Sequence, residues 1–158
     1  MSYNHENLIV GCGNILFGDD GVGPEVIRYM QECNTILPGD TVLIDGGTSS
    51  AHYIFTLPED KWKNIIIIDC ASMNMEAGSV CVLDLDDVAE GENYCEVHEL
   101  SLISALSDLD SRINVRIVAC QPEKGGCKMG LGLTKPVENA IPEIIDVTLR
   151  LLGQMTST

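Results

Sequence analysis

Short runs of aliphatic residues, separated by glycine-rich and polar segments, recur along this chain. The runs at 8–10, 41–44, 65–68 and 115–119 each stop at polar or glycine-containing sequence. Runs of this length and composition predict strands that are buried on both faces, as in a parallel sheet. The run at 65–68 is the clearest, because it consists of four consecutive isoleucines.

Apolar residues at helical spacing predict four helices, at 24–33, 51–57, 99–110 and 134–152. In the first, Val26, Ile27, Met30 and Cys33 share one face. Thr134 is expected to cap the last helix.

Pro142 falls inside the last helix. Proline removes a backbone hydrogen bond and clashes with the preceding turn, so it predicts a kink or a late start of that helix.

The segment at 78–85 follows the isoleucine strand too closely for a helical crossover, which predicts an antiparallel strand at the sheet edge. The segment at 121–133 holds four glycines and is expected to be a mobile loop. The fold class is therefore α/β: a single-domain three-layer sandwich with a mostly parallel, twisted sheet of about five strands, one antiparallel edge strand and helices on both faces. The domain spans 1–158 with its core at 7–152, and the ends at 1–6 and 153–158 are expected to be loose tails.

Composition narrows the range of partners. The 158 residues carry 24 acidic and 9 basic side chains, a formal net charge of −15. Such a charge argues against binding to nucleic acid or to an anionic membrane. The sequence has no signal-peptide pattern and no apolar stretch long enough to span a bilayer, which predicts a cytoplasmic protein. Seven cysteines without C-x-x-C spacing fit free thiols in a reducing compartment.

The first candidate site is the loop that joins the first strand to the first helix. It reads G-C-G-N-I-L-F-G-D-D-G-V-G over 11–23 and contains the acidic pair Asp19 and Asp20. A dinucleotide-binding fingerprint would need a glycine where the chain has Leu16. In a doubly wound sheet the first and third strands flank the ligand-binding crevice, so Asp69, at the end of the third strand, is expected to lie near Asp20.

Two carboxylates in one crevice favour a shared proton or a bound cation. A histidine would complete an oxygen, oxygen, nitrogen ligand set suited to zinc, nickel or a similar divalent ion. Composition alone leaves His5, His52 and His98 as candidates. Cys12 and Cys70 border the crevice, but no base is paired with either in the sequence.

The motifs of the chain resemble those of the hydrogenase maturation proteases. They are G-x-G-N-x-L-x-x-D-D-x-x-G at 11–23, D-G-G-T at 45–48, an aliphatic strand ending at Asp69, and G-L-T-x-x-V at 132–137. The resemblance implies an endopeptidase that removes a C-terminal peptide from the precursor of a nickel-iron hydrogenase large subunit after nickel insertion. The short, acidic chain is also similar to the branch that serves the deazaflavin-reducing hydrogenases of methanogens.

The resemblance also implies a site. It assigns Asp20, Asp69 and His98, in the run E-V-H-E-L, as both the catalytic and the metal-contacting residues. Nickel would arrive inside the precursor, and the isolated protein could take up another divalent metal such as zinc or cadmium. The chain departs from the family pattern at Ser50, at Cys70 and at the residue before His98.

Two alternatives come from other functional classes. A phosphoacceptor receiver domain would use Asp19, Asp20, Asp69 and Lys124, although the acidic pair lies eight residues beyond Gly11 and not at the edge of the strand. A non-catalytic binding module would associate with a metalloenzyme precursor without shortening it.

Overall fold

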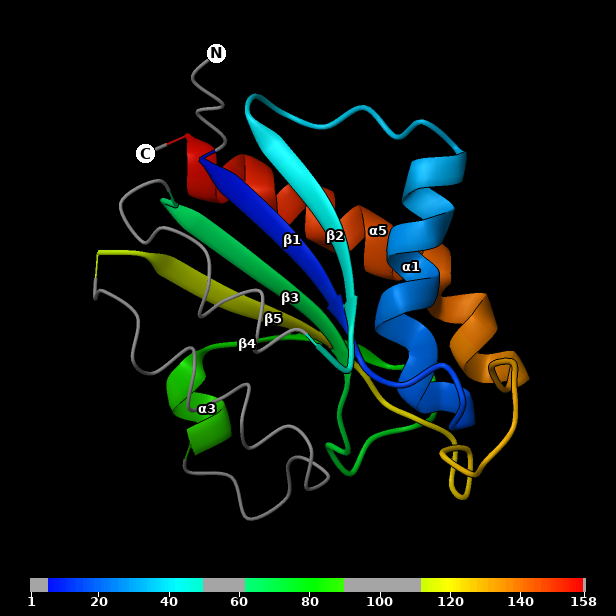
Figure 1. Cartoon of the computed structure of the whole chain (residues 1–158). Coiled ribbons are helices and arrows are strands. Elements are labelled where there is room, and N and C mark those ends of the chain that lie inside the picture. Colours follow the sequence, from blue (N-terminus) through cyan, green and yellow to red (C-terminus); the bar gives the residue numbers. More distant parts are fainter. Residues whose placement is uncertain (1–5, 50–61, 90–111, 158) are drawn as a thin grey trace.

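The protein is built on one five-stranded sheet with the strand order β2-β1-β3-β5-β4 (Figure 1). This architecture comes from a computed structural model that describes residues 6–49, 62–89 and 112–157. The strands are β1 (Asn7–Cys12), β2 (Thr41–Gly47), β3 (Asn64–Cys70), β4 (Val80–Leu83) and β5 (Asn114–Cys120). Every aliphatic run in the sequence thus lies within a strand.

Strands β1, β2, β3 and β5 are parallel, and β4 pairs antiparallel with β5 at one edge. Both features confirm the sequence prediction. Because β1 and β3 are neighbours, their carboxyl ends and the loops that follow them meet at the same place. This adjacency positions the candidate site.

The described helices are α1 (Val22–Glu32), α3 (Leu85–Ala89) and α5 (Lys135–Thr156). The short 3₁₀ turn η1 (Gly18–Gly21) comes directly before α1. The start of α5 at Lys135 means that Pro142 does not delay the helix, and that part of the prediction is wrong. The helix also continues to Thr156, so residues 153–156, expected in a loose tail, are helical. In α1 the buried stripe ends at Met30, and Cys33 is exposed.

Both long helices cover the same face of the sheet (Figure 1). Their buried side chains pack with those of β1, β3 and β5, among them Ile9, Ile66, Ile68 and Val118. The alternate strand residues form a second buried cluster on the opposite face, which includes Trp62 and Leu85 at its border. The sequence helices at 51–57 and 99–110 lie outside the described residues.

The start of α1 sits directly against the carboxyl ends of two strands. A Cβ atom at Gly23 would lie 2.4 Å from the carbonyl oxygens of both Cys12 and Ile68. Only glycine permits this approach, which brings the loop before α1 over the ends of β1 and β3. Among the described residues, no helix is long and apolar enough to cross a membrane.

Candidate active site

The loop between β1 and α1 folds Asp20 back over the end of the sheet. Gly13 has φ +125°, and a Cβ atom there would lie 1.9 Å from the backbone carbonyl oxygen of Asp20. The next residue, Asn14, donates its backbone N–H to the Asp20 Oδ2 at 2.8 Å. Asp20 is buried, with 4% of its surface exposed to solvent. A glycine and a backbone donor therefore set the position of this carboxylate.

Asp69 reaches the same place from the neighbouring strand. Its Oδ1 accepts the backbone N–H of Cys70 at 2.7 Å. The same oxygen would lie 3.5 Å from a Cβ atom at Gly13, the glycine that touches Asp20. The structure thus brings Asp20 and Asp69 together around Gly13, as the order of the strands predicts.

Asp19 has a different environment, although it precedes Asp20 in the chain. It is fully buried, and its carboxylate accepts the backbone N–H groups of Glu123 at 3.0 Å and Thr134 at 2.8 Å. The Thr134 hydroxyl donates to the same carboxylate at 2.8–2.9 Å. The backbone N–H of Asp19 also donates to the carbonyl of Gly126 at 3.0 Å. Asp19 therefore fastens the loop after β1 to the segment between β5 and α5.

This contact changes the role of Thr134. The residue occupies the N-cap position of α5, as the sequence predicts, but its side chain makes no capping hydrogen bond. Its hydroxyl serves Asp19 instead. The predicted N-cap position of Thr134 was right, but the predicted capping by its side chain was wrong. The hydroxyl is bound instead by Asp19, more than a hundred residues away in the sequence.

Two thiols lie near the carboxylates of Asp20 and Asp69. The Sγ atoms of Cys70 and Cys127 are 3.9 Å apart. The hydrogen bond with Cys127, burial, and the negative charges of Asp69 and Asp20 all raise the pKa of Cys70 far above its ordinary value. Cys70 is therefore a neutral thiol at physiological pH and not a thiolate nucleophile.

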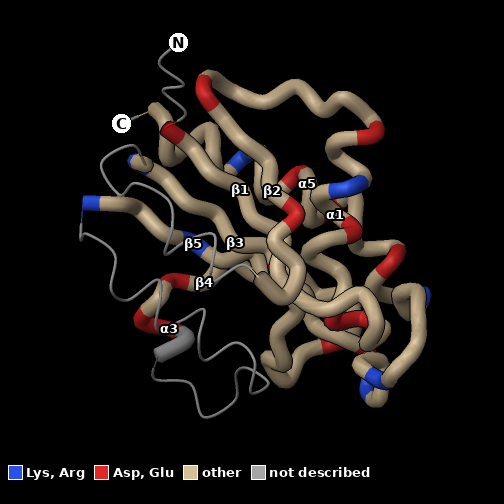
Figure 2. Tube along the Cα trace, in the orientation of Figure 1, with Lys and Arg blue, Asp and Glu red and all other residues tan. Residues whose placement is uncertain are grey.

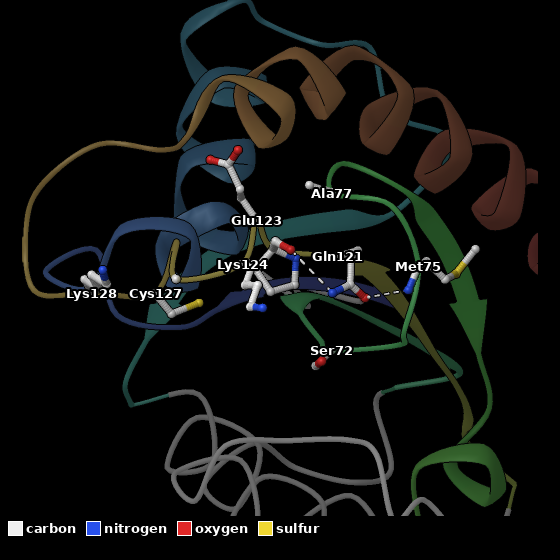
Figure 3. Close-up of a pocket in the computed structure, with 10 residues that line it drawn as sticks. Ser72, Met75, Ala77, Gln121, Glu123, Lys124, Cys127 and Lys128 are labelled. Atoms are coloured by element: carbon white, nitrogen blue, oxygen red, sulfur yellow. Dashed lines mark hydrogen bonds between the residues drawn. The ribbon is translucent and has the colours of Figure 1, made fainter.

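A cavity of about 590 Å³ opens next to these thiols (Figure 3). Gln121, one of the residues that line it, accepts the backbone N–H of Met73 at 2.6 Å through its Oε1, which fixes the segment that follows β3. Cys127 also lines the cavity and so links it to Cys70 beside the acids. Sequence reasoning missed both residues, because their roles depend on contacts between distant segments.

The cavity wall holds positive charge in an otherwise acidic chain. Lys124 and Lys128 both line it (Figure 3), and neither makes an ion pair within the described part of the chain. Figure 2 shows how few basic positions there are among the acidic ones. Glu123 lines the same cavity, so its wall carries both signs of charge.

All three histidines, His5, His52 and His98, lie outside the described residues. Within the described ranges, no group of three histidine, cysteine or acidic side chains is placed to hold a metal ion. The structure accordingly brings together two of the three predicted site residues, and the contribution of His98 stays a prediction. Two carboxylates held close together are suited to holding a cation or to accepting a proton from water.

Comparisons with known proteins identify a single family. The family described as hydrogenase maturation protease matches residues 24–151. The chain is 37% identical over 156 residues to the coenzyme F420 hydrogenase subunit delta of Methanothermobacter thermautotrophicus, covering 97% of this chain and 98% of that protein. It is 27% identical to the hydrogenase 3 maturation protease of Escherichia coli K12, over 87% of this chain and 85% of that one.

The fold comparison agrees. The structure resembles the hydrogenase maturating endopeptidase HybD of E. coli with a TM-score of 0.79 and 26% identity. The match covers 94% of this chain and 93% of that one. The interpretation as a receiver domain is therefore wrong. The chain matches the model of a different family, and its edge strand β4 is antiparallel to β5.

Proposed function

Because the chain belongs to the hydrogenase maturation protease family, we propose that it removes a C-terminal peptide from the precursor of a nickel-iron hydrogenase large subunit. The similarity to the subunit named for a coenzyme F420 hydrogenase points to the deazaflavin-reducing enzyme as the source of that precursor. The partner is then one protein substrate, and neither nucleic acid nor a membrane is involved.

The observation that carries this proposal is the meeting of Asp20 and Asp69 around Gly13. One carboxylate comes from the turn η1 after β1 and the other from the end of β3, and they are held by backbone N–H donors of Asn14 and Cys70. An arrangement fixed by the backbone presents its oxygens in one orientation before the substrate arrives, which favours catalysis and specific binding.

We assign the chemistry to carboxylates, as an aspartic-type reaction. One carboxylate would accept a proton from the attacking water, and the second would contact the metal carried by the substrate. His98 would be the third contact, by its resemblance to the family pattern. Cys70 takes no part as a nucleophile, since its raised pKa keeps it protonated.

In this proposal nickel belongs to the substrate. Two carboxylates and one histidine leave coordination positions open, unlike the closed four-ligand cage of a structural metal site. Ligands within the precursor would fill those positions. The protease would then dock only on a precursor that already carries nickel, and this requirement would prevent it from cutting other chains.

The test compares nickel-loaded with nickel-free precursor. The protease is treated with a chelator, exchanged into metal-free buffer and mixed with each precursor, and the precursor mass is measured. We expect the loaded precursor to lose a short C-terminal peptide and the empty one to stay whole.

Three outcomes would contradict parts of the proposal. Association without any loss of mass would indicate a non-catalytic binding module. Equal cleavage of both precursors would refute recognition through nickel. A stripped protease that stays inactive until metal is added back would mean that the metal belongs to the enzyme.

A further inference from the structure

Large apolar side chains gather on the surface near Asp20 and Asp69. Nine are exposed among the described residues, and five of the nine come from two short segments, at 15–17 and 129–131. Leu16 is 55% exposed, Met129 82% and Leu131 77%. We call this set the apolar rim: Ile15, Leu16, Phe17, Met129 and Leu131.

The two segments form one surface because they are hydrogen-bonded to each other. Gly130 donates its N–H to the carbonyl of Leu16 at 2.7 Å, and Gly18 donates to the carbonyl of Gly130 at 2.9 Å. The side chains of the rim are therefore neighbours in space, although more than a hundred residues separate the segments along the chain. A grouped apolar surface of this kind is typical of an interaction site, unlike scattered single side chains.

The rim is also held in shape. The Asn14 Oδ1 accepts the N–H of Leu16 at 2.9 Å, and the Asn14 carbonyl accepts that of Phe17 at 3.1 Å. Asp19 ties the same loop to Glu123 and Thr134, on either side of the second segment. A surface ordered before binding loses little conformational entropy when a partner covers it.

The rim is continuous with the acids. Asn14, which supports Leu16, also donates its N–H to Asp20. A partner that covers the rim therefore lies beside the loop segment that positions Asp20. Nickel would separate loaded from empty precursor, and a surface beside the carboxylates, which by themselves have little preference among peptide sequences, would add contacts that only one protein can make.

Charge decides between the possible occupants. A net charge of −15 on each copy opposes pairing of two copies through this surface, and it opposes adsorption to an anionic membrane. We propose that the apolar rim docks the folded body of the large-subunit precursor and so delivers its C-terminal segment to Asp20 and Asp69. This inference rests on the proposed function.

The test uses the double variant Met129→Glu/Leu131→Glu, in which both replaced side chains project into solvent. Ile36→Glu is the matched control: Ile36 is 91% exposed but lies between α1 and β2, at the opposite end of the sheet (Figure 1). KM and kcat are measured on nickel-loaded precursor, and binding is measured by titration calorimetry with the same precursor.

We expect KM and Kd to rise roughly ten- to a hundredfold in the double variant, with kcat nearly unchanged and with the control equal to the wild type. Thermal unfolding verifies that each variant is folded, and Leu16→Ser gives a second probe of the same surface. Unchanged KM and Kd in the double variant and in Leu16→Ser would overturn the inference, as would an equal loss with Ile36→Glu. A wild-type protein that never shortens the precursor would refute the proposed function instead.

Discussion

The two ends of the central sheet both carry buried polar side chains, but these find their partners in different ways. At the amino ends of the strands, Asn7, Asn64 and Asn114 lie in register on β1, β3 and β5. Asn64 donates to Asn7 at 2.8 Å, Asn114 donates to Asn64 at 3.1 Å, and Asn7 reaches the Thr41 hydroxyl at 3.4 Å. Neutral side chains here bond to one another in a ladder across four strands.

At the carboxyl ends the polar side chains are acidic, and the backbone holds them. Asp20 accepts the backbone N–H of Asn14 in the loop after β1, Asp69 accepts that of Cys70 at the end of β3, and Gly13 lies between the two carboxylates. The carboxyl end therefore carries acidic groups side by side, whereas the amide ladder carries no charge. From this comparison we predict that the amino end serves stability and the carboxyl end serves binding and chemistry.

The largest expected effect comes from removing one charge at the carboxyl end. Asp20→Asn or Asp69→Asn should lower the processing rate roughly 10²- to 10⁴-fold, the usual contribution of a general acid or base. The melting temperature should change little, because both side chains lie in loops or at strand ends. Rates of precursor shortening and thermal unfolding measure the two quantities.

Asp45→Asn is the matched control, since Asp45 is exposed at the end of the neighbouring strand β2. It should retain wild-type processing. If Asp20→Asn remains active, the assignment of the crevice to catalysis is wrong.

The second effect separates the two adjacent aspartates. Asp19→Asn replaces a carboxylate that accepts the N–H groups of Glu123 and Thr134, so one buried donor would lose its acceptor. The free energy of unfolding should fall by about 2–4 kcal/mol. Urea unfolding gives this value, and the folded protein should process precursor far better than Asp20→Asn. A stable but inactive Asp19→Asn beside an active Asp20→Asn would reverse the two roles.

The sequence was sufficient for the sheet because β-strand burial is a local pattern. Four consecutive isoleucines at 65–68 indicate a strand covered on both faces wherever it lies. The order of parallel strands then placed Asp20 beside Asp69. Neither step required knowledge of a contact between distant side chains.

The roles that sequence reasoning missed all depend on such contacts. The sequence places Asp19 next to Asp20 in one loop, but its partners Glu123 and Thr134 lie over a hundred residues later. The contact between Cys70 and Cys127 also joins residues that are far apart in the sequence. The third site residue, His98, lies outside the described residues and stays a prediction.

A third prediction breaks the amide ladder. Asn64→Leu keeps a similar volume but leaves the Oδ1 of Asn7 and the Nδ2 of Asn114 without their ladder partner. We expect the free energy of unfolding to fall by about 1–3 kcal/mol, with the processing rate per folded molecule unchanged. Asn114→Ala, at the exposed end of the ladder, should cost less. A selective loss of processing in a stable Asn64→Leu protein would contradict the division between the two ends.

The last prediction uses pH, because thiols at the carboxyl end of the sheet titrate whereas the amides at the amino end do not. Burial, with the charges of Asp19 and Glu143, raises the pKa of Cys120 from 9.0 to about 12. Between these values the unfolded chain releases a proton that the folded chain retains. Stability is therefore fully present below pH 9 and falls as pH rises towards 12, by up to about 1.4 kcal/mol per pH unit for this thiol.

Cys120→Ala should flatten that decline, although it lowers stability at neutral pH by removing a buried side chain. Urea unfolding at several values between pH 8 and pH 11 gives the two slopes. Cys33→Ala, which removes an exposed thiol, is the control and should keep the wild-type slope. Some decline should persist in Cys120→Ala, since the pKa of Cys70 is raised as well. Identical slopes in Cys120→Ala and the wild type would show that burial of Cys120 does not couple its proton to folding.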